Sequence, residues 1–461
     1  MTAAPAEPYY GASGMQDRWT DILRADTLVH LCLLGAIAGG CFQGWLKDRF
    51  AGPLPYALSD GLFMLAFLLW FASIVVFRRP MFVTPRASKT DVMLVFIIAL
   101  PFLYVPIFPA PLAVIFAGLR AWVAFPVAAL IGLSITKSAG QVRAYIGLIL
   151  VLCVITAVYG IIQYRAGPDV ALGTGLGHLR HGVTLIYLTQ AGQQAFRAFS
   201  TFTFPAPFAA WMVSGILMAA GIVASRRYPT HWRIAALALT PLFFVAMTLS
   251  GTRAALLTLL LGLLVIGWLR GSAGPQLVLV ALLLFAMHLA VVLSAGSVLD
   301  RFTSIVLQEG LLWRYLTLPI QTGFASLQEH LFGVGLGRTG VGVPLAVTVS
   351  MGPRYFVFAD GDTGRAAVEM GLLGLSWLGV VVFGLLPRAY RAVRAIAATP
   401  DSDLAFGIGA LVLSTGAVIL IGSPLSTTPH ALVWWFLFGA IIKLAQLRAE
   451  AEADVASRST D

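Results

Sequence analysis

The sequence predicts an all-α protein that crosses a membrane many times. Of its 461 residues, 59% are hydrophobic and only 11% are charged, and the mean hydropathy is +0.88. A soluble domain carries about 25% charged residues. The apolar residues gather in runs of roughly 20, which is the length that a helix needs to cross the hydrocarbon core of a bilayer. Composition and run length therefore exclude a soluble globular protein and predict a polytopic one.

Twelve apolar runs are long enough to be membrane spans. The third and fourth are separated only by a proline-rich turn, which is typical of a tight hairpin. The polar stretch before the first run has no good cleavage site, so we expect that run to be retained as a helix. The runs lie at about residues 27–46, 61–77, 91–109, 112–136, 143–163, 205–225, 232–249, 253–271, 275–296, 363–387, 404–421 and 430–447.

The basic residues predict how these spans are oriented. An even number of spans puts both termini on one side. If that side is cytoplasmic, more than half of the 30 Lys and Arg residues lie in cytoplasmic segments, as the positive-inside rule requires. The net charge of +10 then reflects these loops and not a nucleic-acid surface. The predicted order is a cytoplasmic tail at 1–26, nine spans within 27–296 with an outer loop at about 164–204, a large outer loop at 297–362, three spans within 363–447, and a cytoplasmic tail at 448–461.

A second group of basic residues lies in the long outer loops, at outer helix ends or, for Arg120, inside a span. All ten are arginine, whose planar guanidinium can bind phosphate through two parallel hydrogen bonds. We expect this group to hold an anionic ligand at the outer face. The alternative is that they bind lipid headgroups or carboxylates of their own loops. The group comprises Arg120, Arg165, Arg180, Arg197, Arg253, Arg301, Arg314, Arg338, Arg354 and Arg365.

Two of these arginines precede or begin a span. Arg253 opens the eighth span in SGTRAALL. An arginine in the first helical turn opposes the helix dipole, so the arginine and the helix N-terminus together are suited to an anion. Arg197 precedes STFTFPAPFAA, whose hydroxyls and prolines lead into the sixth span. The alternatives are an arginine that extends to the membrane edge at Arg253 and an ordinary loop-to-helix junction at Arg197.

The stretch 331–374 gathers polar groups around the tenth span. Its Gly333, Gly335 and Gly337 form a G-x-G-x-G, which is not a dinucleotide-binding fingerprint because no βαβ unit surrounds it. The glycines indicate either a close backbone approach or a turn. Upstream, residues 305–327 are amphipathic enough to form a helix at the membrane surface, anchored by Trp313 and Tyr315.

Four charged residues begin that tenth span. Asp362, followed by Thr363, is placed as the helix N-cap. Asp360 is then the candidate general base that takes a proton from an acceptor hydroxyl, or a loop carboxylate paired with an arginine. Arg365 and Glu369 are four residues apart and face one another on the helix, as substrate-binding residues or as an ion pair. The cysteines and histidines show no metal-site spacing, so we expect no metal and no cofactor.

Five segments occur in a fixed order along the chain: Arg197 with STFTFPAPFAA, SGTRAALL at Arg253, Trp313–Arg314, HLFGVGLG ending at Gly337, and VEMGLLGL. Together they resemble the superfamily of O-antigen ligases and Wzy-type polysaccharide polymerases. The resemblance covers roughly residues 195–380 by motif, and the whole chain by the number of spans and the large outer loop.

The resemblance implies a GT-C-like fold in the bacterial inner membrane. Such proteins transfer a glycan from an undecaprenyl-diphosphate carrier to a hydroxyl on the periplasmic face, without a metal or a nucleotide sugar. Polymerases use another carrier-linked repeat as acceptor, and ligases use the lipid A core. The arginines that hold the diphosphate would map onto Arg197, Arg253 and Arg314. From the residues themselves we expect further substrate contacts at Arg180, Arg338, Asp362, Arg365 and Glu369. The family implies a chain-length regulator as a partner.

One departure favours a polymerase over a ligase. Ligases of this superfamily usually carry His nine residues before the Glu that here is Glu369, and this chain has Asp360 at that position. A lipid-linked glycan transporter is the alternative outside the enzymes. Transporters often show two matching halves with broken helices at the membrane midplane. This chain shows no matching halves, and its polar residues gather at one face.

Overall fold

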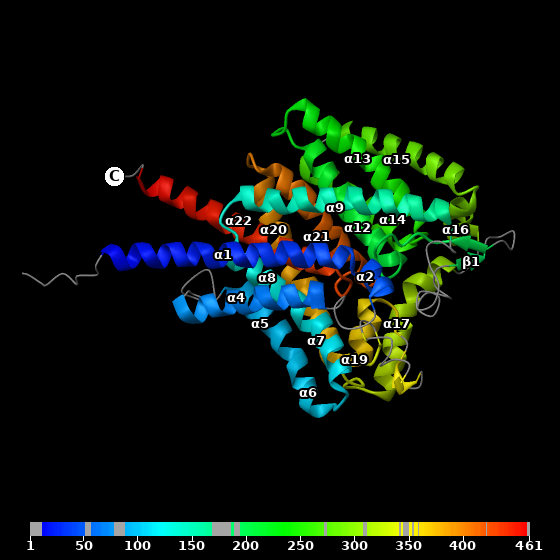
Figure 1. The fold of residues 1–461 in the computed structure, drawn as a ribbon, viewed down its shortest axis with the longest axis horizontal. Coiled ribbons are helices and arrows are strands. Elements are labelled where there is room, and N and C mark those ends of the chain that lie inside the picture. Colours follow the sequence, from blue (N-terminus) through cyan, green and yellow to red (C-terminus); the bar gives the residue numbers. More distant parts are fainter. Residues whose placement is uncertain are drawn as a thin grey trace, which may run out of the picture.

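The computed structural model describes residues 12–50, 57–77, 88–167, 186–188, 194–271, 274–307, 311–340, 343, 350–352, 355–357, 359–420 and 422–458. Its long helices lie side by side in a bundle (Figure 1). We call the end at which the first helix begins and the last helix ends the tail end. The opposite end, which holds the two short strands, α16 (Ser297–Leu307) and α17 (Leu311–Glu329), is the loop end (Figure 1).

The described elements are almost all helical. The two strands, β1 (Ile186–Leu188) and β2 (Gln194–Phe196), pair antiparallel within the predicted outer loop at 164–204. The helices are α1 (Ala12–Cys41), α2 (Gln43–Arg49), α4 (Leu62–Phe77), α5 (Lys89–Ala99), α6 (Tyr104–Ile107), α7 (Leu112–Leu119), α8 (Phe125–Ile135), α9 (Ala139–Ala166), α12 (Pro205–Ala224), α13 (Thr230–Leu249), α14 (Arg253–Arg270), α15 (Gly274–Leu293), α16 (Ser297–Leu307), α17 (Leu311–Glu329), α19 (Gly361–Gly379), α20 (Leu386–Ala397), α21 (Ser402–Val418) and α22 (His430–Arg458).

The protein is an all-α multi-pass membrane protein. Among the described residues, nine helices are long and apolar enough to cross a membrane, and three further apolar helices are shorter, at Asp26–Cys41, Leu277–Leu293 and Ser402–Val418. Each of the twelve predicted runs overlaps one of these helices, which confirms the helical, multi-pass class. That all twelve cross the membrane, and which side each end faces, stay predictions.

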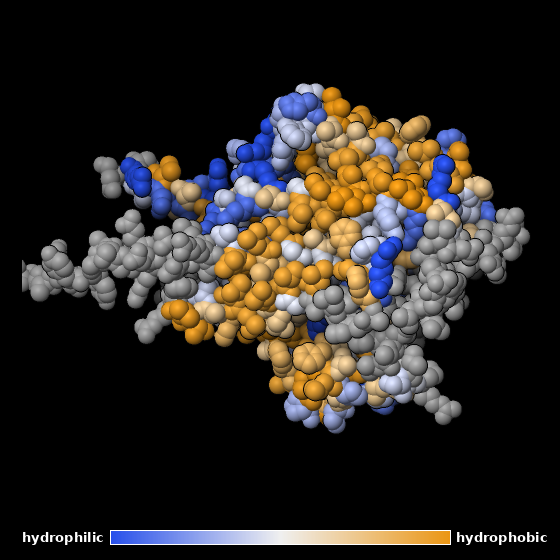
Figure 2. Space-filling model, in the orientation of Figure 1, coloured by the Kyte–Doolittle hydropathy of each residue, from blue (hydrophilic) through white to orange (hydrophobic). Residues whose placement is uncertain are grey.

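Apolar side chains cover the outside of the bundle as well as its core. On the face that Figure 2 shows, hydrophobic residues form a belt across the helices, and hydrophilic residues gather toward the ends. Phe383 on the outer surface is 82% exposed, whereas Trp434 and Trp435 on α22 are fully buried. Because a bilayer solvates apolar side chains, this belt is the surface that lipid tails would cover.

Small residues bring the central helices close together. Gly439 of α22 faces the carbonyl of Ala129 on α8, and Gly132 of α8 faces the carbonyl of Phe436. A Cβ at either glycine would collide with that carbonyl. Close crossings at small residues are the usual way for membrane helices to gain packing contacts.

The amphipathic helix predicted for 305–327 is two helices in the structure. α16 ends at Leu307 and α17 begins at Leu311, with Pro319 inside α17. α17 packs against α19. The contact is close at Gly323, where an added Cβ would lie 3.2 Å from the Cβ of Ala367. The side chains of the predicted anchors Trp313 and Tyr315 lie outside the described residues.

Candidate functional site at the loop end

A buried loop between α9 and α12 fixes the position of Arg197. The side chain of Gln163 accepts hydrogen bonds from the backbone amides of Phe199 (3.0 Å) and Ser200 (2.7 Å) and donates one to the Ser200 carbonyl (3.1 Å). The Ser200 hydroxyl donates to the carbonyl of Thr156 at 2.6 Å. Ser200 has a φ of 55°, a left-handed conformation that is uncommon for serine. The side chain of Gln163 therefore supplies the hydrogen bonds that secondary structure would otherwise give to the backbone of this turn.

Arg197 itself is held against the turn that joins α13 to α14. Its Nε donates to the Ser250 carbonyl at 2.9 Å, and one terminal nitrogen donates to the Thr252 hydroxyl at 3.2 Å. The next backbone amide, of Ala198, bonds to the Leu249 carbonyl at 3.0 Å. Two segments that lie 53 to 55 residues apart in the sequence are thus joined at the start of α14.

Arg253 and Arg301 meet at the same turn. Arg253 is the first residue of α14, and its Nε donates to the Arg301 carbonyl at 3.1 Å. The Nε of Arg301 lies 3.5 Å from the Gly251 carbonyl. A Cβ at Gly251 would lie 3.6 Å from both the Arg197 Nε and the Arg301 Cγ. We call Arg197, Arg253 and Arg301 the arginine cluster.

The arginine cluster concentrates positive charge at the loop end. All three residues are partly buried, and they come from three separate segments. Like charges held this closely repel one another, so an oxyanion placed between them would be stabilised by charge-assisted hydrogen bonds. The arrangement can hold a phosphate or a diphosphate.

Three of the predicted site arginines lie wholly or partly outside the described residues. Arg180 and Arg354 are not described. The backbone of Arg314 lies in α17, but its side chain is not described. Arg301 lies in the cluster beside Arg197 and Arg253, and the role expected for Arg314 stays a prediction. No local motif marks Arg301. The only sequence signal for it was its membership in the group of outer arginines.

The start of α19 differs from the prediction. Asp360, not Asp362, is the N-cap, and its Oδ1 accepts a hydrogen bond from the Gly361 amide at 2.9 Å. Asp362 is fully buried. Its carboxylate accepts hydrogen bonds from the Leu425 amide and the Ser426 hydroxyl, both at 2.8 Å. The N-cap prediction for Asp362 was wrong because the loop before α22 packs onto the first turn of α19 and occupies that carboxylate.

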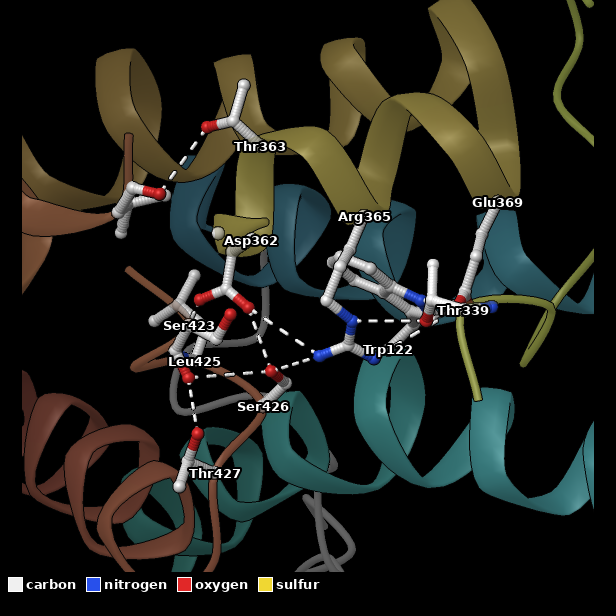
Figure 3. A network of polar contacts seen from close by, with 12 residues as sticks. Trp122, Thr339, Asp362, Thr363, Arg365, Glu369, Ser423, Leu425, Ser426 and Thr427 are labelled. Carbon is white, nitrogen blue, oxygen red and sulfur yellow. Dashed lines mark hydrogen bonds and ion pairs between the residues drawn. The ribbon is translucent and has the colours of Figure 1, made fainter. Parts of the chain in front are cut away.

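Arg365 lies between two carboxylates of its own helix. Its terminal nitrogens lie 3.9 Å from the Asp362 Oδ1 and 4.0 Å from the Glu369 Oε1. Its Nε donates to the Thr339 hydroxyl at 3.3 Å, and a terminal nitrogen donates to the Ser426 hydroxyl. Figure 3 shows the guanidinium pointing into this group. Only 1% of the Arg365 side chain is exposed.

The carboxylate of Glu369 ties three elements together. It accepts hydrogen bonds from the Trp122 indole at 2.7 Å, the Gly337 amide at 3.0 Å and the Thr339 amide at 3.3 Å, and from the Thr339 hydroxyl. Glu369 is fully buried. We call Trp122, Thr339, Asp362, Arg365, Glu369 and Ser426 the α19 network.

The α19 network holds neighbouring segments around the start of α19. We expected Asp362, Arg365 and Glu369 to bind substrate, with an ion pair between Arg365 and Glu369 as the alternative, and that ion pair is present at 4.0 Å. All three side chains are buried. The two carboxylates accept hydrogen bonds from the 337–339 and 425–426 segments, which gives them a positioning role. Their contact with a substrate stays a prediction.

The G-x-G-x-G segment docks onto a break in α19. Gly371 has a φ of 59° and interrupts the helix. The amides of Val334 and Gly335 bond to the carbonyls of Val368 (2.8 Å) and Glu369 (3.1 Å), and the Leu372 amide bonds to the Leu331 carbonyl (3.0 Å). Both interpretations that the sequence left open are observed. The backbone at Gly333 closely approaches Glu369 and Met370, and the Gly333 and Gly340 amides close turns by bonding to the carbonyls of His330 (2.9 Å) and Gly337 (3.0 Å).

Arg338 follows this docked segment. Its guanidinium carbon lies 3.8 Å from the centre of the Tyr355 ring, a cation–π contact. Its carbonyl accepts from the Val357 amide at 2.9 Å. Its Nε is buried and has no hydrogen-bond partner among the residues that the structure describes. Arg338 is thus held beside the segment that leads to Asp360.

Both polar clusters lie at the loop end, and α16 and α17 connect them (Figure 1). α16 carries Arg301, and Pro319 of α17 lies against Gly361, next to Asp360. Within the described ranges no group of three or more His, Cys, Asp or Glu side chains could hold a metal ion. The site thus offers a cationic cluster and a partly buried carboxylate at one end of a membrane bundle.

Comparisons with known proteins do not identify this chain. No protein-family model matches it, and no curated protein matches it.

Proposed function

We propose that this protein is a membrane glycosyltransferase that moves a glycan from undecaprenyl diphosphate to a hydroxyl acceptor at the loop end. The observation that carries the proposal is the arginine cluster. Three guanidinium groups that converge at the edge of an apolar bundle suit a diphosphate whose lipid tail lies in the membrane. The order of the sequence motifs favours the same function.

The chemistry requires positioning and charge stabilisation. The acceptor oxygen bonds to the anomeric carbon of the sugar while the bond from that carbon to the diphosphate oxygen breaks. The electron pair of that bond stays on the diphosphate, where Arg197, Arg253 and Arg301 offset the growing negative charge. Attack from the side opposite the leaving group inverts the anomeric centre.

Asp360 is the candidate base for the acceptor hydroxyl. It is partly exposed, whereas the nearby Asp362 is buried and fully engaged. Its bond to the Gly361 amide uses one carboxylate oxygen, which fixes the orientation of the group. The acceptor proton passes to this carboxylate as the new bond forms. Arg338 and Arg314, and Arg180 within the outer loop, are the further candidates for contacts to the glycan.

The proposal places the site in the periplasm, with both termini in the cytoplasm and the chain in the bacterial inner membrane. A polymerase is favoured over an O-antigen ligase because Asp360 occupies the position at which ligases carry His. The acceptor is then a second carrier-linked glycan in place of the lipid A core. A chain-length regulator is a further proposed partner, and the transfer uses no metal and no cofactor.

Complementation in the native host tests the proposal. The gene is deleted and replaced with the native sequence or with Arg253→Ala, Arg301→Gln or Asp360→Ala, and envelope glycans are sized on gels. We expect each variant to lower transfer by roughly 10²-fold or more. Arg49→Ala is the control, since Arg49 is an exposed arginine of α2 that lies outside the group of ten.

The glycan pattern separates the alternatives. Single repeats with no long chains indicate a lost polymerase, and long chains that stay on the carrier indicate a lost ligase. Normal glycans from a well-expressed Arg253→Ala variant and a well-expressed Arg301→Gln variant would rule out the diphosphate role of the arginine cluster. The transporter alternative would then gain support.

A further inference from the structure

A second cationic site lies at the tail end, far from the arginine cluster along the helices. A cavity of about 530 Å³ opens where α12 and α14 end and where α20 connects to α21. Small-molecule sites typically enclose about 300–1,000 Å³. Figure 2 shows hydrophilic residues gathered over the α12–α13 and α20–α21 connections. The polar and aromatic lining residues are Arg226, Arg227, Arg270, Thr399, Ser402 and Phe406.

The positive charge at this cavity exceeds the negative charge around it. One terminal nitrogen of Arg270 is buried and has no hydrogen-bond partner in the described part of the chain. The charges of Arg233 and Arg226 both act on the Arg270 guanidinium. Arg226, Arg233 and Arg270 form no ion pair with a described carboxylate, because the nearby Asp401 and Asp403 are bound to other groups.

Those two aspartates lie next in sequence to residues that line the cavity, Pro400 and Ser402. Arg143 of α9 lies 2.6 Å from Asp401 and 2.9 Å from Asp403. The Tyr228 hydroxyl donates to Asp403 at 3.0 Å, and Arg227 lies 3.2 Å from Asp401. These contacts hold α9, the α12–α13 connection and the start of α21 in one frame. The remaining cations are therefore brought together before any ligand binds, which lowers the cost of binding an anion.

Exposed aromatic residues place the cavity at the depth of lipid headgroups. Trp268 on α14 is 61% exposed and stacks on Tyr390 of α20 at a centroid distance of 5.1 Å. Trp232, next to Arg233, is 59% exposed. Exposed tryptophans near the ends of apolar helices are typical of the membrane interface. Basic pockets between helices at this depth suit phosphate-bearing headgroups.

We propose that this cavity binds a phosphate group, and that an anionic phospholipid headgroup supplies it. The arginines would hold the phosphate oxygens through charge-assisted hydrogen bonds, while the acyl chains lie along the apolar surface beside Trp268. This site is separate from the proposed transfer site, so the proposal stands or falls independently of the glycosyltransferase function.

The test uses the purified full-length protein, stripped of lipid and returned to nanodiscs. Phosphatidylglycerol is titrated against phosphatidylcholine, and native mass spectrometry counts the bound lipid. The double variant Arg226→Gln/Arg270→Gln should bind phosphatidylglycerol at least about tenfold more weakly, since each surface cation strengthens binding to anionic lipid. Arg391→Gln is the matched control, because Arg391 is an exposed α20 arginine outside the cavity lining.

A second variant keeps the arginines and adds a negative charge to the cavity. Ser402 lines the cavity in the first turn of α21, where a carboxylate suits the helix dipole. Ser402→Glu should therefore fold and also weaken phosphatidylglycerol binding. Inorganic phosphate at millimolar concentration is the competing ligand. If it displaces the lipid, and if it stabilises the native protein but neither variant, the ligand is a soluble phosphate and the lipid assignment is overturned. Native-like phosphatidylglycerol binding by both variants would overturn the site itself.

Discussion

Arg365 is a buried cation whose polar partners come from three parts of the chain. It lies between Asp362 and Glu369 and also bonds to Thr339 and Ser426. Charged groups at this depth are costly unless their partners are all in place. The Arg365–Glu369 pair was visible in the sequence from its spacing, whereas the contact with Asp362 was not, because Asp362 was expected to cap the helix. The hydroxyl partners were not, because a serine or threonine in a distant loop carries no signal of what it contacts.

Glu369→Gln tests whether this network holds the protein together. The amide keeps the shape of the side chain but removes one negative charge and one hydrogen-bond acceptor. Arg365 then loses an ion-pair partner, and one of the donors from Trp122 and Thr339 loses its acceptor. We expect the free energy of unfolding to fall by about 2 kcal/mol. Thermal unfolding in detergent measures the change. Glu452→Gln is the control, because Glu452 pairs with Arg448 at the exposed end of α22 and exposed pairs contribute about 0–1 kcal/mol. Equal effects from the two variants would refute the structural role of Glu369.

The sequence predicted only some residues of the candidate site. Arg197 and Arg253 stood out because each precedes or begins a span, and Asp360 stood out by its spacing from Glu369. Arg301 did not stand out, because its position near Gly251 depends on how α16 turns back over the start of α14. Long-range convergence of this kind leaves no local pattern in a sequence.

At the scale of a single helix, the sequence did not predict the break in α19. VEMGLLGL reads as a continuous helix, and glycines are common inside membrane helices. In the structure Gly371 adopts a φ of 59° and a ψ of −137°. A Cβ there would collide with the Leu331 carbonyl and the Gly333 amide. The helix breaks because residues 331–337 supply hydrogen bonds to α19 in place of those that the helix loses.

Gly371→Ala should therefore release this docked segment. The positive φ and the collision together are expected to lower the free energy of unfolding by about 3 kcal/mol. Gly379→Ala is a matched control in the same helix, since nothing lies within 4 Å of a Cβ at that position. It should change the stability by no more than about 1 kcal/mol, in the stabilising direction. The two variants are compared by thermal unfolding, and a Gly371→Ala protein as stable as Gly379→Ala would contradict the described docking.

At the scale of the whole molecule, hydrophobic run length was enough to predict the class of fold. Each run coincides with a helix because a chain in a bilayer must satisfy its backbone hydrogen bonds internally. The helix order in space was not predictable, since the same runs can be arranged in many ways around one another. It depends on close contacts at small residues such as Gly132 and Gly439, which the run pattern does not reveal.

The start of α1 and the end of α22 lie at one end of the bundle, and this predicts which introduced cysteines a reagent outside the inner membrane can reach. α1 begins and α22 ends at the tail end, and α9 ends at the loop end (Figure 1). The exposed Ala451 and Ala166 report on these two ends. If the basic tail end is cytoplasmic, a membrane-impermeant maleimide that crosses only the outer membrane should label Ala166→Cys in intact cells. It should label Ala451→Cys only after the inner membrane is opened, and the native chain, whose three cysteines lie in apolar helices, gives the background. The reverse pattern would put the arginine cluster in the cytoplasm and exclude the periplasmic transfer that we propose.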